Sequence, residues 1–87
     1  MTIRIIDFSG GGAVNTATAS FDNGDLAAGV YTFNHALDVQ FLAIAVYDNN
    51  DIEVTPDDIT ATDSNNIAID LSAYGAIAGT WNVRGVG

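Results

Sequence analysis

The sequence predicts an all-β protein, a single antiparallel β-sandwich of immunoglobulin-like character with six to seven short strands. Three observations lead to this fold class. Short apolar runs alternate with a period of two, turn-forming Asp, Asn and Gly clusters separate them, and no stretch has the period of a long helix. Strands of this kind pack as two sheets around one core. The 87 residues are expected to form one domain over 13–87, preceded by an N-terminal strand or arm with a glycine hinge over 1–12.

The run VQFLAIAVY over residues 39–47 is expected to be the central strand. It is apolar on both faces after Gln40, whereas a strand with one face in water should alternate apolar and polar residues. Its second face therefore needs a cover, supplied either by another part of the chain or by a neighbouring subunit. A short buried helix is the alternative. The aromatic and β-branched residues, and the turn signal at 48–51, favour the strand.

The strands expected before the central one lie in a half of the chain with little to bury. Residues 2–7 (TIRIID) alternate and are followed by a glycine-rich break at 9–12. They form either the first strand of the sandwich or an arm that pairs with a neighbour. Residues 13–20 are small and polar and make a weaker strand candidate. After a turn at 22–25, residues 30–34 (VYTFN) are the next predicted strand.

Four further strands are expected after the central one. Residues 52–55 form its hairpin partner, and Pro56 ends that pairing because proline has no N–H for the ladder. Residues 59–62 and 67–71 alternate as strands. Residues 80–86 form the last strand, in which the indole N–H of the only tryptophan needs a partner.

The large apolar residues of these strands are expected to form the core. They are Tyr31, Phe33, Phe41, Leu42, Ile44, Val46, Ile67, Ile69, Leu71 and Trp81. An unpaired buried carboxylate is costly, so Leu42→Asp is expected to unfold or disperse the protein.

The charge balance excludes several classes of partner. Eleven acidic residues face only two arginines, giving a formal net charge of −9, and there is no cysteine. Two arginines cannot form a basic patch, so nucleic-acid binding and attachment to anionic membranes are not expected. The acids are expected to be solvated loop residues, with adaptation to salty surroundings as the alternative.

The chain shows neither the apolar segment of a signal peptide nor a membrane-spanning run, so synthesis in a cytoplasm is expected.

The sequence holds no pattern typical of an active site, and no enzymatic activity is expected. His35 is the only histidine, and no serine lies in a nucleophile-elbow sequence. A histidine that forms hydrogen bonds at a strand end is the favoured interpretation, and neither a zinc nor an iron site is available. No cofactor is expected, with calcium as the one alternative. Its candidate ligands are Asp48 and Asp51 in one turn, or Asp22 and Asp25 in another.

An ordered series of short phrases over residues 33–87 resembles a small β-sandwich module found in virion proteins of tailed bacteriophages. The phrases are Phe33-Asn34-His35, Val46-Tyr47-Asp48-Asn49-Asn50, Val54-Thr55-Pro56-Asp57-Asp58-Ile59-Thr60, Thr62-Asp63-Ser64-Asn65-Asn66 followed by Ile67-Ala68-Ile69-Asp70-Leu71, and Gly79-Thr80-Trp81-Asn82-Val83. Their order carries the likeness, because no single phrase is diagnostic. The resemblance implies a structural or adhesive role, no catalysis and assembly as multimers.

Within this resemblance, a capsid decoration or cement protein is expected, located in the virion and bound to the major capsid protein or another virion protein. A tail-fibre or head-fibre module for adhesion is the alternative, although the single module beginning at Met1 and the lack of heptads depart from a long fibre. A homo-oligomer is expected, most simply a trimer. The expected partner-binding residues are Ile3, Arg4, Ile5 and Ile6, which can add a strand to a neighbour's sheet edge.

Overall fold

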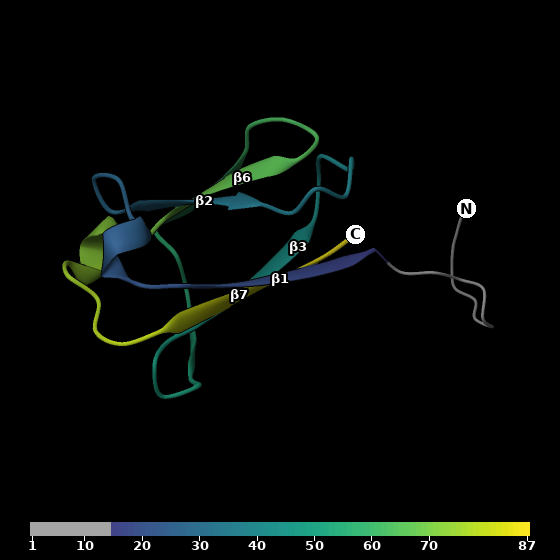
Figure 1. Cartoon of the computed structure of the whole chain (residues 1–87). Helices are drawn as coiled ribbons and strands as arrows, with labels where there is room; N and C mark the ends of the chain where they lie inside the picture. Colours follow the sequence, from purple (N-terminus) through teal and green to yellow (C-terminus); the bar gives the residue numbers. More distant parts are fainter. Residues whose placement is uncertain (1–14) are drawn as a thin grey trace.

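A computed structural model describes residues 15–87, which form a two-layer β-structure (Figure 1). The strands are β1 (Thr16–Phe21), β2 (Val30–Asn34), β3 (Ala43–Tyr47), β4 (Glu53–Val54), β5 (Asp58–Ala61), β6 (Asn66–Asp70) and β7 (Trp81–Val86). Two short 3-10 turns, η1 (Asn23–Asp25) and η2 (Ser72–Tyr74), lie together at one end of the layers. The strand or arm predicted over residues 2–7 and the hinge that follows it lie outside the described residues.

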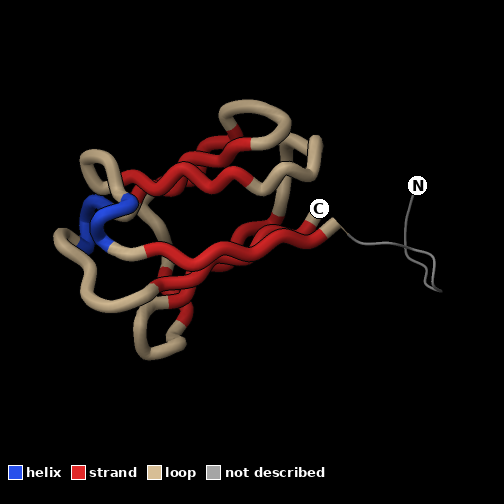
Figure 2. The backbone as a smooth tube through the Cα atoms, in the orientation of Figure 1, coloured by secondary structure: helices blue, strands red, loops and turns tan. Residues whose placement is uncertain are grey.

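The strands form two antiparallel sheets that face each other (Figure 2). One sheet has the order β1-β7-β3-β4 and the other has the order β2-β6-β5. The chain passes from one sheet to the other after β1, β2, β4 and β6. This arrangement confirms the predicted all-β antiparallel sandwich. Each strand predicted from residue 13 onwards is present; β2 has the predicted ends, and the other strands begin or end at different residues.

The core lies between the inner faces of the two sheets. Its buried apolar residues are Phe21, Phe33, Val46, Ile67, Ile69, Leu71, Ile77, Trp81 and Val83. The Phe21 ring of β1 stacks on the Tyr31 ring of β2 with centroids 4.2 Å apart, which joins the two sheets at their β1 and β2 sides. The Trp81 Nε1–H donates to the Ala78 carbonyl at 3.1 Å, so the indole has the partner it was expected to need.

The predicted central strand is shorter than expected. It begins at Ala43, where β3 pairs with β7 on one side and with β4 on the other. Residues 35–42 instead carry the chain from the three-stranded sheet to the four-stranded sheet. In this crossover Leu42 packs against the core, whereas Phe41 remains 76% exposed. The prediction that Phe41 belongs to the core is therefore wrong.

The other core predictions are confirmed in large part. Six of the predicted residues are buried: Phe33, Val46, Ile67, Ile69, Leu71 and Trp81. Tyr31, Leu42 and Ile44 are half-buried and pack against the buried cluster. Sequence reasoning missed Phe21, Ile77 and Val83 as core residues.

Candidate partner-binding surface

The partner-binding residues predicted from the sequence, Ile3, Arg4, Ile5 and Ile6, lie outside the described residues. Their role therefore stays a prediction. The strands of residues 15–87 offer one candidate surface.

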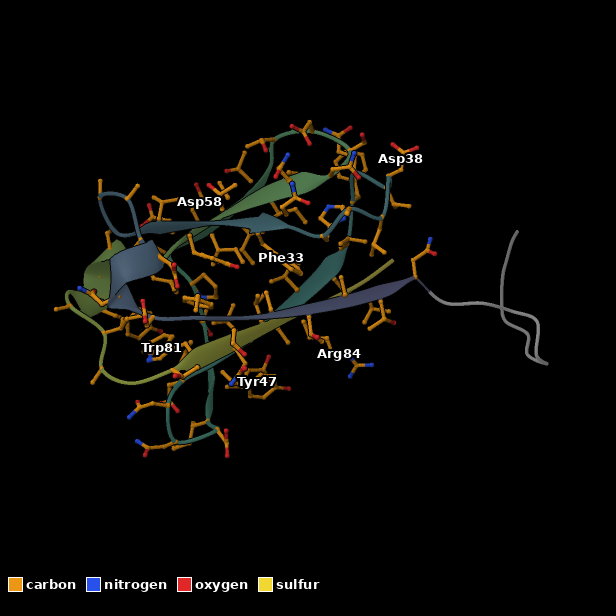
Figure 3. The ribbon with its side chains drawn as sticks, viewed as in Figure 1. Phe33, Asp38, Tyr47, Asp58, Trp81 and Arg84 are labelled. Carbon is orange, nitrogen blue, oxygen red and sulfur yellow. The ribbon has the colours of Figure 1, made fainter. Side chains whose placement is uncertain are left out.

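One face of the four-stranded sheet points away from the core, and we call its part on β1, β7 and β3 the outer sheet face. The strand register places Thr18 beside Arg84 and Arg84 beside Ala45 on this face. Figure 3 shows Arg84 and Tyr47 directed away from the layer that holds Phe33. The outer sheet face consists of Thr16, Thr18, Ser20, Asn82, Arg84, Val86, Ala43, Ala45 and Tyr47.

Short side chains make most of the outer sheet face. The Ser20 hydroxyl donates to the Asn82 side-chain oxygen at 2.7 Å, which links β1 to β7. Ala43 is exposed, and Ala45 and Tyr47 are half-buried. Residues 15–87 thus leave the second apolar face of β3 at the surface. The expectation that another part of the chain or a neighbouring subunit covers it stays a prediction.

The acidic residues avoid the outer sheet face. The segments TATASF, AIAVY and WNVRGV of β1, β3 and β7 contain no Asp or Glu, and Arg84 is their only charged residue. The nearest acid on the same sheet is Glu53 of β4, which pairs with Tyr47 at the margin. The protein has a formal charge of −9. Among the surfaces of residues 15–87, an acid-free face of this kind would repel an anionic partner or a second copy less than the acidic loops would.

The two acidic turns considered for calcium use their carboxylates to fix the backbone. Asp22 Oδ1 accepts the Gly24 N–H at 2.9 Å, and Asp25 Oδ2 accepts the Asp22 N–H at 3.0 Å, which is a capping box on η1. Asp48 Oδ1 accepts two backbone N–H groups in the β3–β4 turn, from Asn50 at 2.8 Å and from Ile52 at 3.0 Å. Within residues 15–87 no group of three His, Cys, Asp or Glu side chains is arranged to hold a metal.

His35 lies just after β2 and is 5% exposed. Its backbone N–H donates to the Asn65 carbonyl at 2.9 Å, and its Nδ1 accepts the Leu37 N–H at 3.2 Å. This hydrogen bond assigns the ring proton to Nε2, which is buried without a hydrogen-bond partner among the described residues. The edge of the ring meets Phe33, with ring centroids 5.9 Å apart. The only imidazole therefore shapes the crossover and is closed to a substrate.

The loop between β5 and β6 packs beside this crossover. Asp63 Oδ1 accepts the Asn65 N–H at 2.8 Å and an N–H of the Asn66 side chain at 3.1 Å. These two hydrogen bonds hold the pKa of the Asp63 carboxyl below its ordinary value of 3.8. The hydrogen bond from the Asn65 backbone has the larger effect, and the one from the Asn66 side chain adds to it. Asn65 in turn accepts the Asp38 N–H through its side-chain oxygen at 2.7 Å. The charged form of Asp63 thus fixes a loop that holds the crossover in place.

The remaining surface features are dispersed. The large exposed apolar residues come from four separate segments: Phe41, Ile52, Ile59 and Tyr74. Two open depressions, of about 440 and about 500 Å³, border the 3-10 turns. Their linings consist mostly of small and polar residues around Asn23. Neither depression gathers the convergent polar groups of a small-molecule site.

Comparison of the chain with known protein families, curated proteins and solved structures gives no match. The described residues contain no helix that is long and apolar enough to cross a membrane.

Proposed function

We propose that this protein is a non-enzymatic structural protein of a phage virion, a capsid decoration or cement protein that binds the outer shell and strengthens it. Its expected partner is the major capsid protein or another virion protein. The proposal combines the resemblance over residues 33–87 with a single structural observation. That observation is a broad, acid-free sheet face, centred on Arg84, on an otherwise strongly acidic sandwich.

The composition of this face suits a structural contact. Its short Thr, Ser, Asn and Ala side chains lose little conformational entropy when a partner covers them. Arg84 supplies the one charge, and a planar guanidinium can bind a carboxylate of the shell through two parallel hydrogen bonds. The burial of His35 also supports a role without catalysis, since the single imidazole cannot reach a substrate.

Copy number tests the proposal against its alternative. Quantification of this protein against the major shell protein in purified virions should give hundreds of copies per particle. A few copies per particle would favour the tail-fibre or head-fibre module for host adhesion. Absence of the protein from virions would contradict both.

A charge-reversal variant tests the face itself. Arg84→Glu should weaken binding of the purified protein to empty capsids, because it replaces the one cation on the contact with an acid. Arg84 is exposed, so its replacement should leave the melting temperature nearly unchanged. Asp58→Lys on the other sheet is the matched control and should bind normally. Normal binding by Arg84→Glu would show that another surface meets the shell.

A further inference from the structure

β1 is an edge strand, and its backbone has a defined open side among the described residues. It pairs with β7 alone. The Gly87 N–H donates to the Asn15 carbonyl at 2.8 Å, which makes 15 and 87 a hydrogen-bonded pair just before the strand. Because such pairs alternate in an antiparallel ladder, the backbone groups of residues 17, 19 and 21 face β7. Those of Thr16, Thr18 and Ser20 face the open side.

Two other sheet edges carry local protection. β4 is only two residues long, and Pro56 follows shortly after it. On β5, the Ile59 N–H donates to the Asp58 carboxylate at 3.0 Å, and the Ala61 carbonyl accepts the Gln40 side-chain amide at 3.3 Å. These groups are therefore less available to an incoming strand.

The edge of β2 is covered at its start. The Val30 N–H and carbonyl are both used by Ala27, with N···O distances of 3.0 and 2.9 Å. By contrast, β1 is six residues long and has no proline and no charged side chain in TATASF. Such an edge is a template for pairing with another chain.

We propose that β1 pairs antiparallel with β1 of a second copy about a two-fold axis at Thr18. The open side of each strand presents residues 16, 18 and 20, so these three must pair among themselves. Antiparallel pairing then places Thr18 opposite Thr18 of the partner subunit, and Thr16 opposite Ser20 of the partner subunit. On the inner side, Ala17 comes opposite Ala19 of the partner subunit. All these pairs are small, and Thr–Thr and Thr–Ser pairs across strands are favourable.

The charge distribution makes a second copy the fitting occupant. Two chains of charge −9 repel each other over most of their surfaces, but neither β1 nor the adjoining β7 contains an acid. The nearest acid in sequence is Asp22, which follows the strand. In the antiparallel pair the two Asp22 residues stand eight positions apart, about 27 Å at ~3.4 Å per residue. This separation exceeds the Debye length of about 8 Å at physiological salt.

This pairing is isologous and closes as a dimer with one continuous sheet across both copies. It goes beyond the proposed function, since it requires no capsid. The trimer expected from the sequence would need a different contact, and sedimentation distinguishes the two assemblies.

A proline at the axis tests the pairing in the full-length chain. Thr18→Pro removes the N–H that faces the open side and leaves the β7 ladder intact. Thr32→Pro is the matched control on the β2 edge. The backbone groups of residues 31 and 33 face β6, so those of Thr32 face the open side, as those of Thr18 do on β1. Sedimentation should give twice the 9.0 kDa chain mass for the wild type and for Thr32→Pro, and one chain mass for Thr18→Pro. A monomeric wild type, or a Thr18→Pro variant with unchanged mass, would overturn the proposal.

A second variant covers the case in which the proline prevents folding. In Thr18→Glu, the new carboxylate lies beside Arg84 of its own chain, which favours the folded monomer. In the dimer, however, the carboxylates of the two copies would lie directly opposite each other at the axis. The variant should sediment as a folded monomer, and a stable dimer would contradict the pairing.

Cysteine cross-linking tests the register, since the protein has no native cysteine. Directly opposed hydrogen-bonded residues have Cα atoms about 5.5 Å apart, within the range that a disulfide spans. Thr18→Cys should therefore oxidise to a covalent dimer. Thr16→Cys should not, because its counterpart on the other copy lies four positions away. Equal cross-linking of the two variants would rule out the two-fold axis at Thr18, as would a trimeric mass that persists in Thr18→Pro.

Discussion

At the residue scale, the two phenylalanines Phe33 and Phe41 show how strongly position decides the role of a side chain. Phe33 lies between the two layers and is 1% exposed (Figure 3). A Cβ at Gly85 would lie 3.2 Å from the Phe33 ring, so the strand opposite approaches it without a side chain in between. Phe41 is 76% exposed in the crossover. The same residue type therefore contributes very differently to stability.

Alanine replacements should separate these contributions. Phe33→Ala removes a fully buried ring and leaves a cavity, so it should lower the free energy of unfolding by about 3–5 kcal/mol. Phe41→Ala should change it by less than about 0.5 kcal/mol, since surface truncations usually have small effects. Urea titration monitored by Trp81 fluorescence measures both. Equal losses would show that the crossover packs differently from the structure.

Asp63 should make stability depend on pH in the acid range. Hydrogen bonds from Asn65 and Asn66 lower its folded pKa below 3.8, so the folded state binds fewer protons than the unfolded state as pH falls. The contribution of the charged carboxylate is present above the unfolded pKa and is lost as the pH falls through the folded pKa. Asp63→Asn should thus be less stable than wild type at pH 7, with a smaller difference at pH 3. The exposed Asp38→Asn serves as the control, and a difference for Asp63→Asn that grows on acidification would contradict this account.

At the element scale, the crossover from β2 to β3 sets which residues enter the core. Ala36 and Asp38 adopt positive φ angles of 56°, which turn the chain out of β2 before β3 begins. Leu42 then reaches the β7 end: a Cβ at Gly85 would lie 2.9 Å from the Leu42 Cδ1. Phe41, one position earlier, is directed to solvent because successive side chains of an extended chain point to opposite sides.

Aspartate scanning of this crossover tests the alternation. Leu42→Asp places a carboxylate against the apolar core beside Gly85 of β7, and the protein should lose most of its stability. Phe41→Asp places the same group in water and should fold normally. Circular dichroism and urea midpoints measure both variants. A tolerated Leu42→Asp together with a damaging Phe41→Asp would indicate that the alternation is shifted by one residue.

At the whole-molecule scale, residues 15–87 form a core between the two sheets. The nine buried apolar side chains of this part of the chain lie between Phe21 and Val83, and they come from both sheets and from the loop before β7. The described residues extend over 41 × 27 × 18 Å, so the layers are long relative to their depth. Packing of this kind should not depend on the first residues of the chain.

Removal of residues 1–9 tests that independence. The truncated protein should stay folded with a nearly unchanged melting temperature, and should still sediment as a dimer if β1 forms the pair. Under the hypothesis that residues 2–7 dock as an arm, it should no longer bind capsids. Full-length protein in the same buffer is the control. Loss of folding on truncation would show instead that residues 2–7 are an integral strand of the sandwich.

Residue patterns are enough to predict most of the strands, the turns and the all-β class, because these depend on local chemistry. The period-two runs at 30–34 and 67–71 predicted β2 and β6 closely. In the turns rich in Asp and Asn, aspartate carboxylates accept hydrogen bonds from backbone N–H groups two residues later, which is why these residue types mark turns. The same patterns do not show where a strand leaves one sheet for the other. They therefore predict a buried Phe41, which is exposed, and give no sign that Phe21 is buried.

Three features follow from the packing of the whole chain: the burial of Phe21 and Val83, the acid-free outer sheet face and the open edge of β1. Each depends on strands far apart in the sequence: Phe21 is buried because β1 pairs with β7 and stacks on Tyr31 of the opposite sheet. Arg84 stands in an acid-free face because the register brings Thr18 and Ala45 to its two sides. Periodicity reports the two faces of one strand, whereas the neighbours of that strand follow from how the whole chain packs.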